Sequence, residues 1–221
     1  MEKEISGYQL ETCFGPRGCP NRAIVCPGLA AELRECLQAR DIASFLKRIV
    51  PGPLKRHHEF RISLSDCPNA CSQPQIADIG LIGACQPTLT PEACSLCYAC
   101  REACPEGAIS FTGNRPGVDK GKCLACGKCS KVCPTGTLQE GQKGYRLLLG
   151  GKLGRHPRLA TELPGLVAPE DLPGIIEHIL DYYLRHCRQG ERLGEILERA
   201  GWEEMAKKSC LDNMADNPHN L

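Results

Sequence analysis

The chain has 221 residues, a formal net charge of +1 and 17 cysteines, about 8% of its residues. The length suits one ordinary domain with a small insertion, and the charge argues against a nucleic-acid partner or a polybasic membrane-surface segment. The cysteine content calls for disulfides or metals. The N-terminal segment MEKEISGYQLETC has no apolar core, and no stretch reaches the length of a membrane span. We therefore expect a cytoplasmic protein whose cysteines bind metal.

The first motif along the chain is a pair of cysteines, Cys13 and Cys19, in a C-x5-C spacing. A helix-like stretch follows over residues 28–50, in which apolar residues recur at helical spacing until Gly52 and Pro53 end it. Alone, the C-x5-C pair favours buried free thiols, because free cysteine is among the most buried side chains.

A strand and a second cysteine pair follow this helix. Residues 60–65 alternate apolar and polar side chains, which predicts a half-buried strand. The strand leads into a C-x3-C turn, in which Pro68 and Asn69 tighten the chain so that Cys67 and Cys71 can face one metal centre. Taken alone, this spacing is also compatible with zinc. The segment 76–83 then reads as another strand, with glycines where a neighbouring group approaches closely.

A doubled cysteine run occupies residues 94–134. Each half reads C-x2-C-x2-C-x3-C-P, the run that holds a [4Fe–4S] cluster in bacterial ferredoxins. Three thiolates at this spacing wrap one face of a cubane within a tight loop, and the fourth points to the other cluster. A zinc-ribbon-like module would use four cysteines in two pairs, so eight in this register fit it poorly. The eight cysteines are Cys94, Cys97, Cys100, Cys104, Cys123, Cys126, Cys129 and Cys133.

The last third of the chain contains a glycine-rich segment and two predicted helices. In the segment GGKLGRHP, Gly150, Gly151 and Gly154 let the backbone approach a ligand closely. Apolar residues at helical spacing over 170–187 and 191–205 predict two helices that serve the core or a subunit contact.

These parts together resemble a known family. Cys13 and Cys19 with SDCPNACSQPQIADIGLIGAC resemble the sirohaem–[4Fe–4S] signature of the sulfite and nitrite reductases. The segment GYRLLLGGKLGRHPRLATEL resembles the strand and loop after the ferredoxin insert of dissimilatory and anaerobic members. The resemblance covers roughly residues 10–165 and implies a third cubane, whose last thiolate is also the axial ligand of the sirohaem iron. By position, its ligands are Cys13, Cys19, Cys67 and Cys71.

The resemblance also implies the fold, the cofactors and the ligand sets. We expect an α+β half-module of a sulfite/nitrite reductase, a mixed sheet with covering helices, carrying an inserted two-cluster ferredoxin-like domain. The reductase module would span residues 1–87 and 142–221, and the ferredoxin-like domain residues 88–141. The expected cofactors are three [4Fe–4S] clusters and sirohaem. Cross-ligation would place Cys94, Cys97, Cys100 and Cys133 on one cubane, and Cys104, Cys123, Cys126 and Cys129 on the other.

Reduction of sulfite or nitrite also needs cations that bind the oxyanion and deliver protons. The candidate catalytic residues are Lys55, Arg56, Lys152 and Arg155. Lys55 and Arg56, with His57 and His58, fit a solvated loop equally well. The candidate residues for binding the sirohaem are Asn69, Cys71, Gly150 and Gly151.

The chain also departs from the family pattern, because only twelve residues precede Cys13 where family members carry a related first half. A second subunit, or a second copy of this chain in a homodimer, would then complete the sirohaem pocket. The other expected partners are an electron-donor protein and the oxyanion itself. The competing hypothesis is a non-catalytic electron-transfer or tetrapyrrole-binding protein that keeps the scaffold. Five cysteines without ligand-spaced partners favour free thiols: Cys26, Cys36, Cys85, Cys187 and Cys210.

Overall fold

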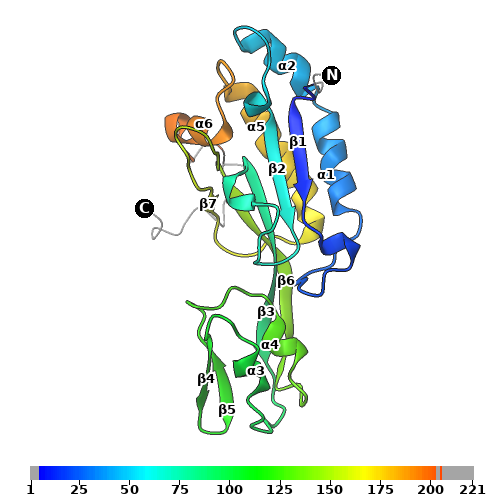
Figure 1. Ribbon diagram of the computed structural model, residues 1–221, viewed down its shortest axis with the longest axis vertical. Coiled ribbons are helices and arrows are strands. Elements are labelled where there is room, and N and C mark those ends of the chain that lie inside the picture. Colours follow the sequence, from blue (N-terminus) through cyan, green and yellow to red (C-terminus); the bar gives the residue numbers. More distant parts are fainter. Residues whose placement is uncertain (1–4, 203–204, 206–221) are drawn as a thin grey trace.

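The computed structural model describes residues 5–202 and residue 205, and it has two lobes (Figure 1). The large lobe is a five-stranded mixed sheet with helices packed on it. The small lobe, residues 90–137, lies at the end of the two longest strands. This arrangement confirms the expected α+β class with a mixed sheet and covering helices. In the described part of the chain, no helix is long and apolar enough to cross a membrane.

The sheet of the large lobe combines parallel and antiparallel strands. The first three strands run parallel to one another, the fourth is antiparallel to the third, and the fifth is antiparallel to the fourth. Because the first three run in one direction, their carboxyl ends meet at one edge of the sheet. In spatial order the strands are β1 (Tyr8–Thr12), β2 (Phe60–Ser65), β3 (Ile79–Leu89), β6 (Leu138–Leu149) and β7 (Thr161–Glu162).

Helices cover one face of this sheet. Phe60, Ile62 and Leu64 of β2 point into a single buried apolar cluster with the helices, and Figure 1 shows α5 behind the strands. The intervening residues of β2 point to the opposite face, where the loop 66–78 crosses the sheet. The helices of the large lobe are α1 (Leu29–Gln38), α2 (Ile42–Ile49), α5 (Leu172–His186) and α6 (Leu193–Ala200).

Two of the predicted helices differ from the structure. The single helix expected over residues 28–50 is two helices, because the helix is interrupted at Asp41, a left-handed residue with φ 36°. The Asp41 carboxylate accepts a hydrogen bond from the Ser44 N–H (3.3 Å) and so caps the N-terminus of α2. The helix expected over residues 191–205 is interrupted: α6 ends at Ala200, Gly201 adopts a φ of 82°, and Trp202 and Met205 beyond this break are again helical. Residues 203–204, within the predicted helix, lie outside the described part of the chain.

The prediction that β2 is half-buried was wrong, because its polar side is covered by the chain itself. Ser63 and Ser65 are 3% and 1% exposed. The Ser63 hydroxyl donates to the Ser72 carbonyl (2.6 Å), and the Ser65 and Ser72 hydroxyls lie 2.7 Å apart. The loop 66–78 therefore supplies the hydrogen bonds that these serines would otherwise make with water.

The small lobe is built on the far end of the β3–β6 pair. This antiparallel ladder runs from Ile79 opposite Leu149 to Leu89 opposite Leu138, with an irregularity between Cys85 and Pro87. A small apolar cluster of its own, which includes Ile109, fills the lobe. Its elements are the short helices α3 (Ala99–Glu102) and α4 (Lys128–Lys131) and the hairpin strands β4 (Ile109–Thr112) and β5 (Arg115–Val118).

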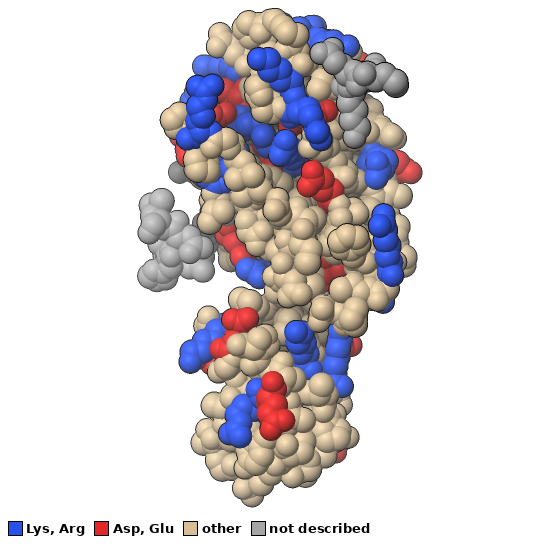
Figure 2. Space-filling model, viewed as in Figure 1, with Lys and Arg blue, Asp and Glu red and all other residues tan. Residues whose placement is uncertain are grey.

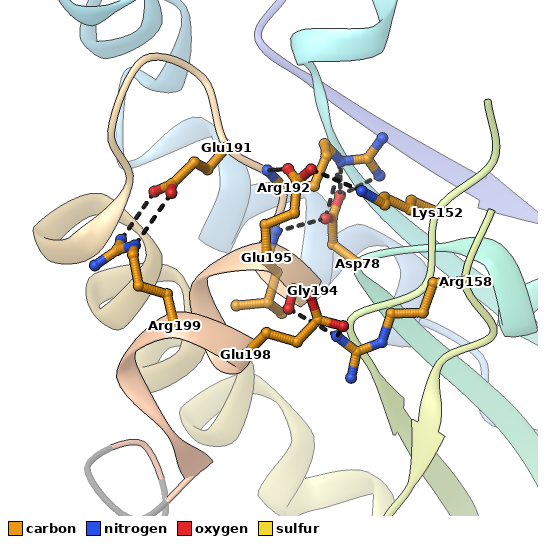
Figure 3. A network of polar contacts seen from close by, with 10 residues as sticks. Asp78, Lys152, Arg158, Glu191, Arg192, Gly194, Glu195, Glu198 and Arg199 are labelled. Carbon is orange, nitrogen blue, oxygen red and sulfur yellow. Dashed lines mark hydrogen bonds and ion pairs between the residues drawn. The ribbon is translucent and has the colours of Figure 1, made fainter. Parts of the chain in front are cut away.

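A buried ion pair joins β2, β3 and α6 at the opposite end of the ladder (Figure 3). The Asp78 carboxylate is fully buried and lies 2.6 Å from Nη2 of Arg192. It also accepts hydrogen bonds from the main-chain N–H groups of Leu193 (3.1 Å) and Arg61 (2.8 Å). Each oxygen therefore has partners, which a buried carboxylate requires.

We expect Asp78→Asn to lower the free energy of unfolding by about 3–5 kcal/mol, because the substitution leaves the buried Arg192 charge without its counter-ion. Urea denaturation followed by circular dichroism measures this loss. The matched control is Lys143→Ala, which removes the exposed pair with Glu140 and is expected to change stability by less than about 1 kcal/mol. Equal losses in the two variants would contradict the role given to Asp78.

Candidate metal centres

Four cysteines gather at the edge where β1 and β2 end, and we name them the Cys13 group: Cys13, Cys19, Cys67 and Cys71. Cys13 directly follows β1, and its N–H donates to the Leu64 carbonyl of β2 (3.0 Å). Cys67 follows the end of β2 by two residues. Because the two strands are parallel, both segments leave the sheet on the same side, the usual position of ligand sites in such sheets.

Main-chain N–H groups surround the first sulfur of this group. The Sγ of Cys13 accepts hydrogen bonds from Gly15 (3.2 Å) and Asp66 (3.3 Å). A helical turn at Gly15–Arg17 then reverses the chain toward Cys19. N–H donors to sulfur stabilise a negatively charged thiolate and are one of the means by which a protein tunes an iron–sulfur cluster.

The thiols of Cys13, Cys19 and Cys71 each lie within electrostatic range of Cys67. Burial raises the pKa of the Cys67 thiol, and the neighbouring cysteines Cys13, Cys19 and Cys71 raise it further, whereas the N–H of Asn69 lowers it. A cationic metal centre would relieve this mutual repulsion. Cys71 is exposed whereas Cys67 is buried, so one thiol of the group faces outward.

The two cysteine runs of the small lobe share an unusual backbone conformation. Leu96 and Ala125, at equivalent positions of the two runs, have φ values of 57° and 54°. Tyr98 and Gly127, two residues further on, have φ values of 57° and 69° and precede α3 and α4. A left-handed conformation costs free energy for residues other than glycine. Its repetition at equivalent positions therefore indicates that both loops form the same kind of functional site.

These loops direct N–H groups at the cysteine sulfurs. The N–H two residues after the first cysteine donates to its Sγ in both runs, at 3.4 Å for Cys94 and for Cys123. The sulfurs of the fourth cysteines, Cys104 and Cys133, also accept main-chain N–H bonds at 3.4 Å. The repeated sequence motif thus places its first and fourth cysteine sulfurs in the same hydrogen-bonding environment in both runs.

Electrostatic contacts between thiols link the two runs of the small lobe at Cys100. Burial raises the pKa of Cys100, and Cys133 of the other run is the first of the cysteines that raise it further, followed by Cys97. Burial raises the pKa of Cys129 to about 11, with contributions from Cys126 and Cys123 of its own run. The exchange of the fourth cysteines stays a prediction, and we name the two sets expected from the sequence the Cys94 group (Cys94, Cys97, Cys100, Cys133) and the Cys123 group (Cys104, Cys123, Cys126, Cys129).

The three cysteine groups offer thiol ligands, the kind that holds iron–sulfur clusters. Within the described residues, no three histidine, cysteine or acidic side chains converge so as to hold one metal ion. The four thiolates of a [4Fe–4S] cluster each bind a different iron atom, so they surround the cluster without meeting at one point. Clustered thiols with N–H donors on sulfur are the features that fit this cofactor.

The two basic segments expected from the sequence converge on one pocket of about 570 Å3. It is lined by His57 and His58 from the turn before β2, and by Lys152, Arg155 and His156 from the loop before β7. Figure 2 shows Lys and Arg side chains gathered over this part of the sheet face. Lys55 and Arg56 are exposed and do not line the pocket, whereas Arg192 and Glu195, which no sequence pattern indicated, do.

The glycine-rich segment packs on the chain itself in this structure. A Cβ on Gly150, where φ is 82°, would lie 2.9 Å from the Cα of Gly194, and one on Gly151 would lie 2.5 Å from the Gln75 carbonyl oxygen. The Nζ of Lys152 lies 2.6 Å from Glu195 (Figure 3). These glycines therefore permit close packing against α6 and the loop 66–78, and a ligand-binding role for them stays a prediction.

The basic pocket and the Cys13 group lie at opposite ends of β2. The pocket residues His57 and His58 precede the strand, and Cys67 follows it. From Phe60 to Ser65 a strand spans about 17 Å at roughly 3.3 Å per residue. One small oxyanion cannot touch both ends, whereas a ligand of macrocycle size lying on this face could reach from one towards the other.

Arg61 is a candidate ligand-binding residue that the sequence pattern did not reveal, because in the alternating strand it counts only as a polar position. Arg61 points to the same face of β2 as Ser63 and Ser65, and among the described residues its buried Nε has no hydrogen-bond partner. An unpaired buried guanidinium N–H is costly, and an anionic ligand on this face would satisfy it. A cation within an otherwise buried strand is the sequence signal that could have revealed it.

Of the five cysteines expected to be free thiols, Cys36, Cys85 and Cys187 are buried, and Cys26 is partly buried. Cys210 lies outside the described residues. None of the described four belongs to the three groups named above.

A mixed α+β sheet with cysteine groups built for cubane clusters defines an iron–sulfur protein. Residues 18–215 match the sequence model of the nitrite and sulphite reductase 4Fe-4S domain, and the chain belongs to this family.

Two relatives show how much of a larger protein this chain covers. It is 31% identical over 230 residues to the coenzyme F420-dependent sulfite reductase of Methanocaldococcus jannaschii, an alignment that covers 93% of this chain and 36% of that protein. It is 29% identical over 175 residues to the dissimilatory-type sulfite reductase subunit beta of Nitratidesulfovibrio vulgaris, covering 69% and 46%. The chain thus spans less than half the length of both relatives.

The fold is also found in solved structures. Dissimilatory sulfite reductase I superposes with a TM-score of 0.61 at 18% identity, over 96% of this chain and 55% of that one. The Mycobacterium tuberculosis NirA protein gives a TM-score of 0.50 at 19% identity, over 91% and 27%. At these identities the similarity establishes the fold alone.

We expect Gly127→Ala to destabilise the protein more than Gly113→Ala, although both glycines have positive φ (69° and 58°). The backbone conformation alone costs a non-glycine residue about 1–2 kcal/mol. At Gly127 the new Cβ would also lie 3.2 Å from the Sγ of Cys85, whereas at Gly113 it meets nothing within 4 Å. Thermal unfolding of the two variants measures the difference, and equal midpoints would contradict it.

Proposed function

We propose that this chain is the catalytic half-module of a reductase that converts sulfite, or nitrite, with sirohaem and three [4Fe–4S] clusters. The Cys13 group would hold the cubane next to the sirohaem, with Cys71 as the bridging thiolate. The Cys94 and Cys123 groups would hold the two clusters of a ferredoxin-like domain over residues 88–141, set between the reductase segments 1–87 and 142–221. The family membership of the chain supports this proposal.

The observation that carries the proposal is the position of Cys71. It is the exposed member of a cysteine group whose other members are partly or fully buried. It lies beside the sheet face on which Arg61 has an unpaired buried donor and which leads to the basic pocket. A thiolate facing outward at one end of a sheet face whose other end is cationic suits an iron-bearing macrocycle with carboxylate side chains. When bound, the sirohaem would supply the iron at which the oxyanion is reduced.

The distance along β2 assigns different roles to the candidate cationic residues. Lys152 and Arg155 lie about one strand length from the Cys13 group, which favours contact with sirohaem carboxylates rather than with a small oxyanion at the iron. Asn69 lies next to Cys71 in the turn and stays a candidate for contact with the macrocycle. Lys55 and Arg56, which are exposed, stay candidates for binding the substrate or for a solvated loop.

The proposal includes partners. Two relatives are themselves subunits of larger enzymes by name, one of the anaerobic sulfite reductase of Salmonella typhimurium and the other the dissimilatory-type subunit beta. A second subunit or a second copy of this chain would then complete the sirohaem pocket on the open face of the sheet. An electron-donor protein would reduce the small lobe.

The test is anaerobic purification followed by iron analysis, a visible spectrum and a reduced-viologen assay with sulfite and with nitrite. We expect about twelve cluster irons, one further iron in sirohaem, and turnover of one of the two oxyanions. Cys71→Ser should shift the sirohaem absorption and lower turnover, whereas Cys36→Ala, which removes a buried thiol of the main core, should leave both unchanged. Clusters without sirohaem or turnover would instead support a non-catalytic electron-transfer protein.

We expect Arg155→Ala to lower the amount of sirohaem retained without raising the KM for the oxyanion in the molecules that retain it, because the Arg155 loop lies far from the Cys13 group. Sirohaem content per chain and steady-state kinetics measure the two quantities. Arg34→Ala, on the exposed side of α1, is the control for loss of one positive charge. A raised KM with full sirohaem content would place Arg155 at the substrate.

A further inference from the structure

We propose that Cys85, a cysteine outside the three groups, is the contact through which the Cys123 group exchanges electrons with the Cys13 group. The Cys123 centre is then the proximal donor, and the Cys94 centre is the distal one, where electrons enter. The inference rests on the proposed function in one respect, that the cysteine groups hold clusters.

Cys85 lies where β3 passes from the large lobe into the small lobe. It is fully buried, whereas the following residue, Gln86, is exposed. Its N–H donates to the Ala125 carbonyl (2.6 Å), and it forms an isolated parallel bridge with Cys126. The second cysteine run is thus docked by its backbone onto β3 at this residue.

The side chain of Cys85 faces both centres. A Cβ placed on Gly127, next to Cys126, would lie 3.2 Å from the Sγ of Cys85, so this thiol touches the loop of the Cys123 group. On the other side, Cys85 forms a buried cluster with Ala23 and Cys67, and Cys67 belongs to the Cys13 group. This cluster is separate from the apolar core of either lobe.

A second tie joins the same two regions. The Nζ of Lys131, at the end of α4, donates to the Arg22 carbonyl (2.5 Å), in the loop that follows Cys19. Figure 1 shows α4 beside the long strands below this N-terminal loop. In contrast, α3, which carries Cys100 of the Cys94 group, packs against α4 and β4 inside the small lobe.

The electron route follows from this packing, because electron transfer between centres falls steeply with distance and is faster through packed atoms than across a gap. With clusters bound, the Cys123 group would hold the donor of one electron and the Cys13 group would hold its acceptor, and no atom is transferred. The Cys94 group would hold the centre that returns one electron to the Cys123 centre. That centre takes its electron from an external one-electron carrier, which a viologen radical replaces in the assay.

The order of the centres is tested by electron paramagnetic resonance of the fully reduced full-length protein. We expect spin–spin interaction at the Cys13 centre to persist in Cys97→Ser, which damages the Cys94 centre, and to disappear in Cys126→Ser, which damages the Cys123 centre. The reverse result, or an interaction insensitive to both substitutions, would overturn the order. Iron analysis of each variant identifies which centre has been lost.

The role of Cys85 is tested by rapid mixing with reduced viologen and freeze-quenching. In Cys85→Ala we expect the small-lobe clusters to be reduced as fast as in the unaltered protein, and reduction of the Cys13 centre to be slowed several-fold. Cys36→Ala, which removes another buried cysteine from the main core, should slow neither step. Cys85→Ser keeps a third heavy-atom position close to that of the sulfur and most of the side-chain volume, and it should recover most of the rate.

The outcomes separate this inference from the function on which it rests. Full iron content with an unchanged rate in Cys85→Ala overturns the role of Cys85 and leaves the proposed function standing. Absence of iron from the Cys13 or Cys123 group in the unaltered protein overturns both. If Cys85→Ala itself loses iron, the rate at which the Cys13 centre is reduced is measured in Cys85→Ser instead. A rate in Cys85→Ser that stays several-fold below that of the unaltered protein overturns a role that depends on packing.

Discussion

The antiparallel ladder of β3 and β6 is the constraint on which the rest of the structure depends. The two strands stay paired from Ile79 opposite Leu149 to Leu89 opposite Leu138, with one irregularity between Cys85 and Pro87. The ladder therefore belongs to both lobes. Its upper part is buried in the sheet, and its lower part carries the small lobe. Two adjacent strands with paired backbones are far stiffer than a flexible linker. The Cys13 group of the large lobe and the two cysteine groups of the small lobe are therefore held at fixed positions relative to one another.

Two positions along this ladder organise different chemistry. At the irregularity within the ladder, Cys85 contacts the second cysteine run. At its upper end the Asp78 carbonyl accepts a hydrogen bond from Gly150 (2.8 Å), and the Asp78 carboxylate holds Arg192, so the basic pocket is anchored to the first residues of β3. A buried ion pair of this kind does little for stability compared with an apolar contact, but it fixes the position of the charged loop around it.

The sequence predicted best what short segments determine. The repeated cysteine spacing of the small lobe is accompanied by a repeated local backbone conformation, at Leu96 and at Ala125. The break at Asp41 was missed because one left-handed residue leaves the helical spacing of apolar residues intact. The burial of Ser65 was missed because the covering group, Ser72, lies in a loop that folds back over the strand. The convergence of His57 with Lys152, and the unpaired Nε of Arg61, depend on strand order, which no local pattern records.

The pairing of Leu89 with Leu138 also has a consequence for how the chain folds. The segment between them is a loop that closes when β6 pairs with β3, and closing a longer flexible loop costs more conformational entropy. Metal bound to the small lobe would order that intervening segment locally and so favour the pairing, after which the ladder can close upward to Ile79 and Leu149. If the small lobe holds its proposed clusters, iron supply and completion of the large-lobe sheet would be linked, and a chain starved of iron would expose the open edge of β3 to aggregation.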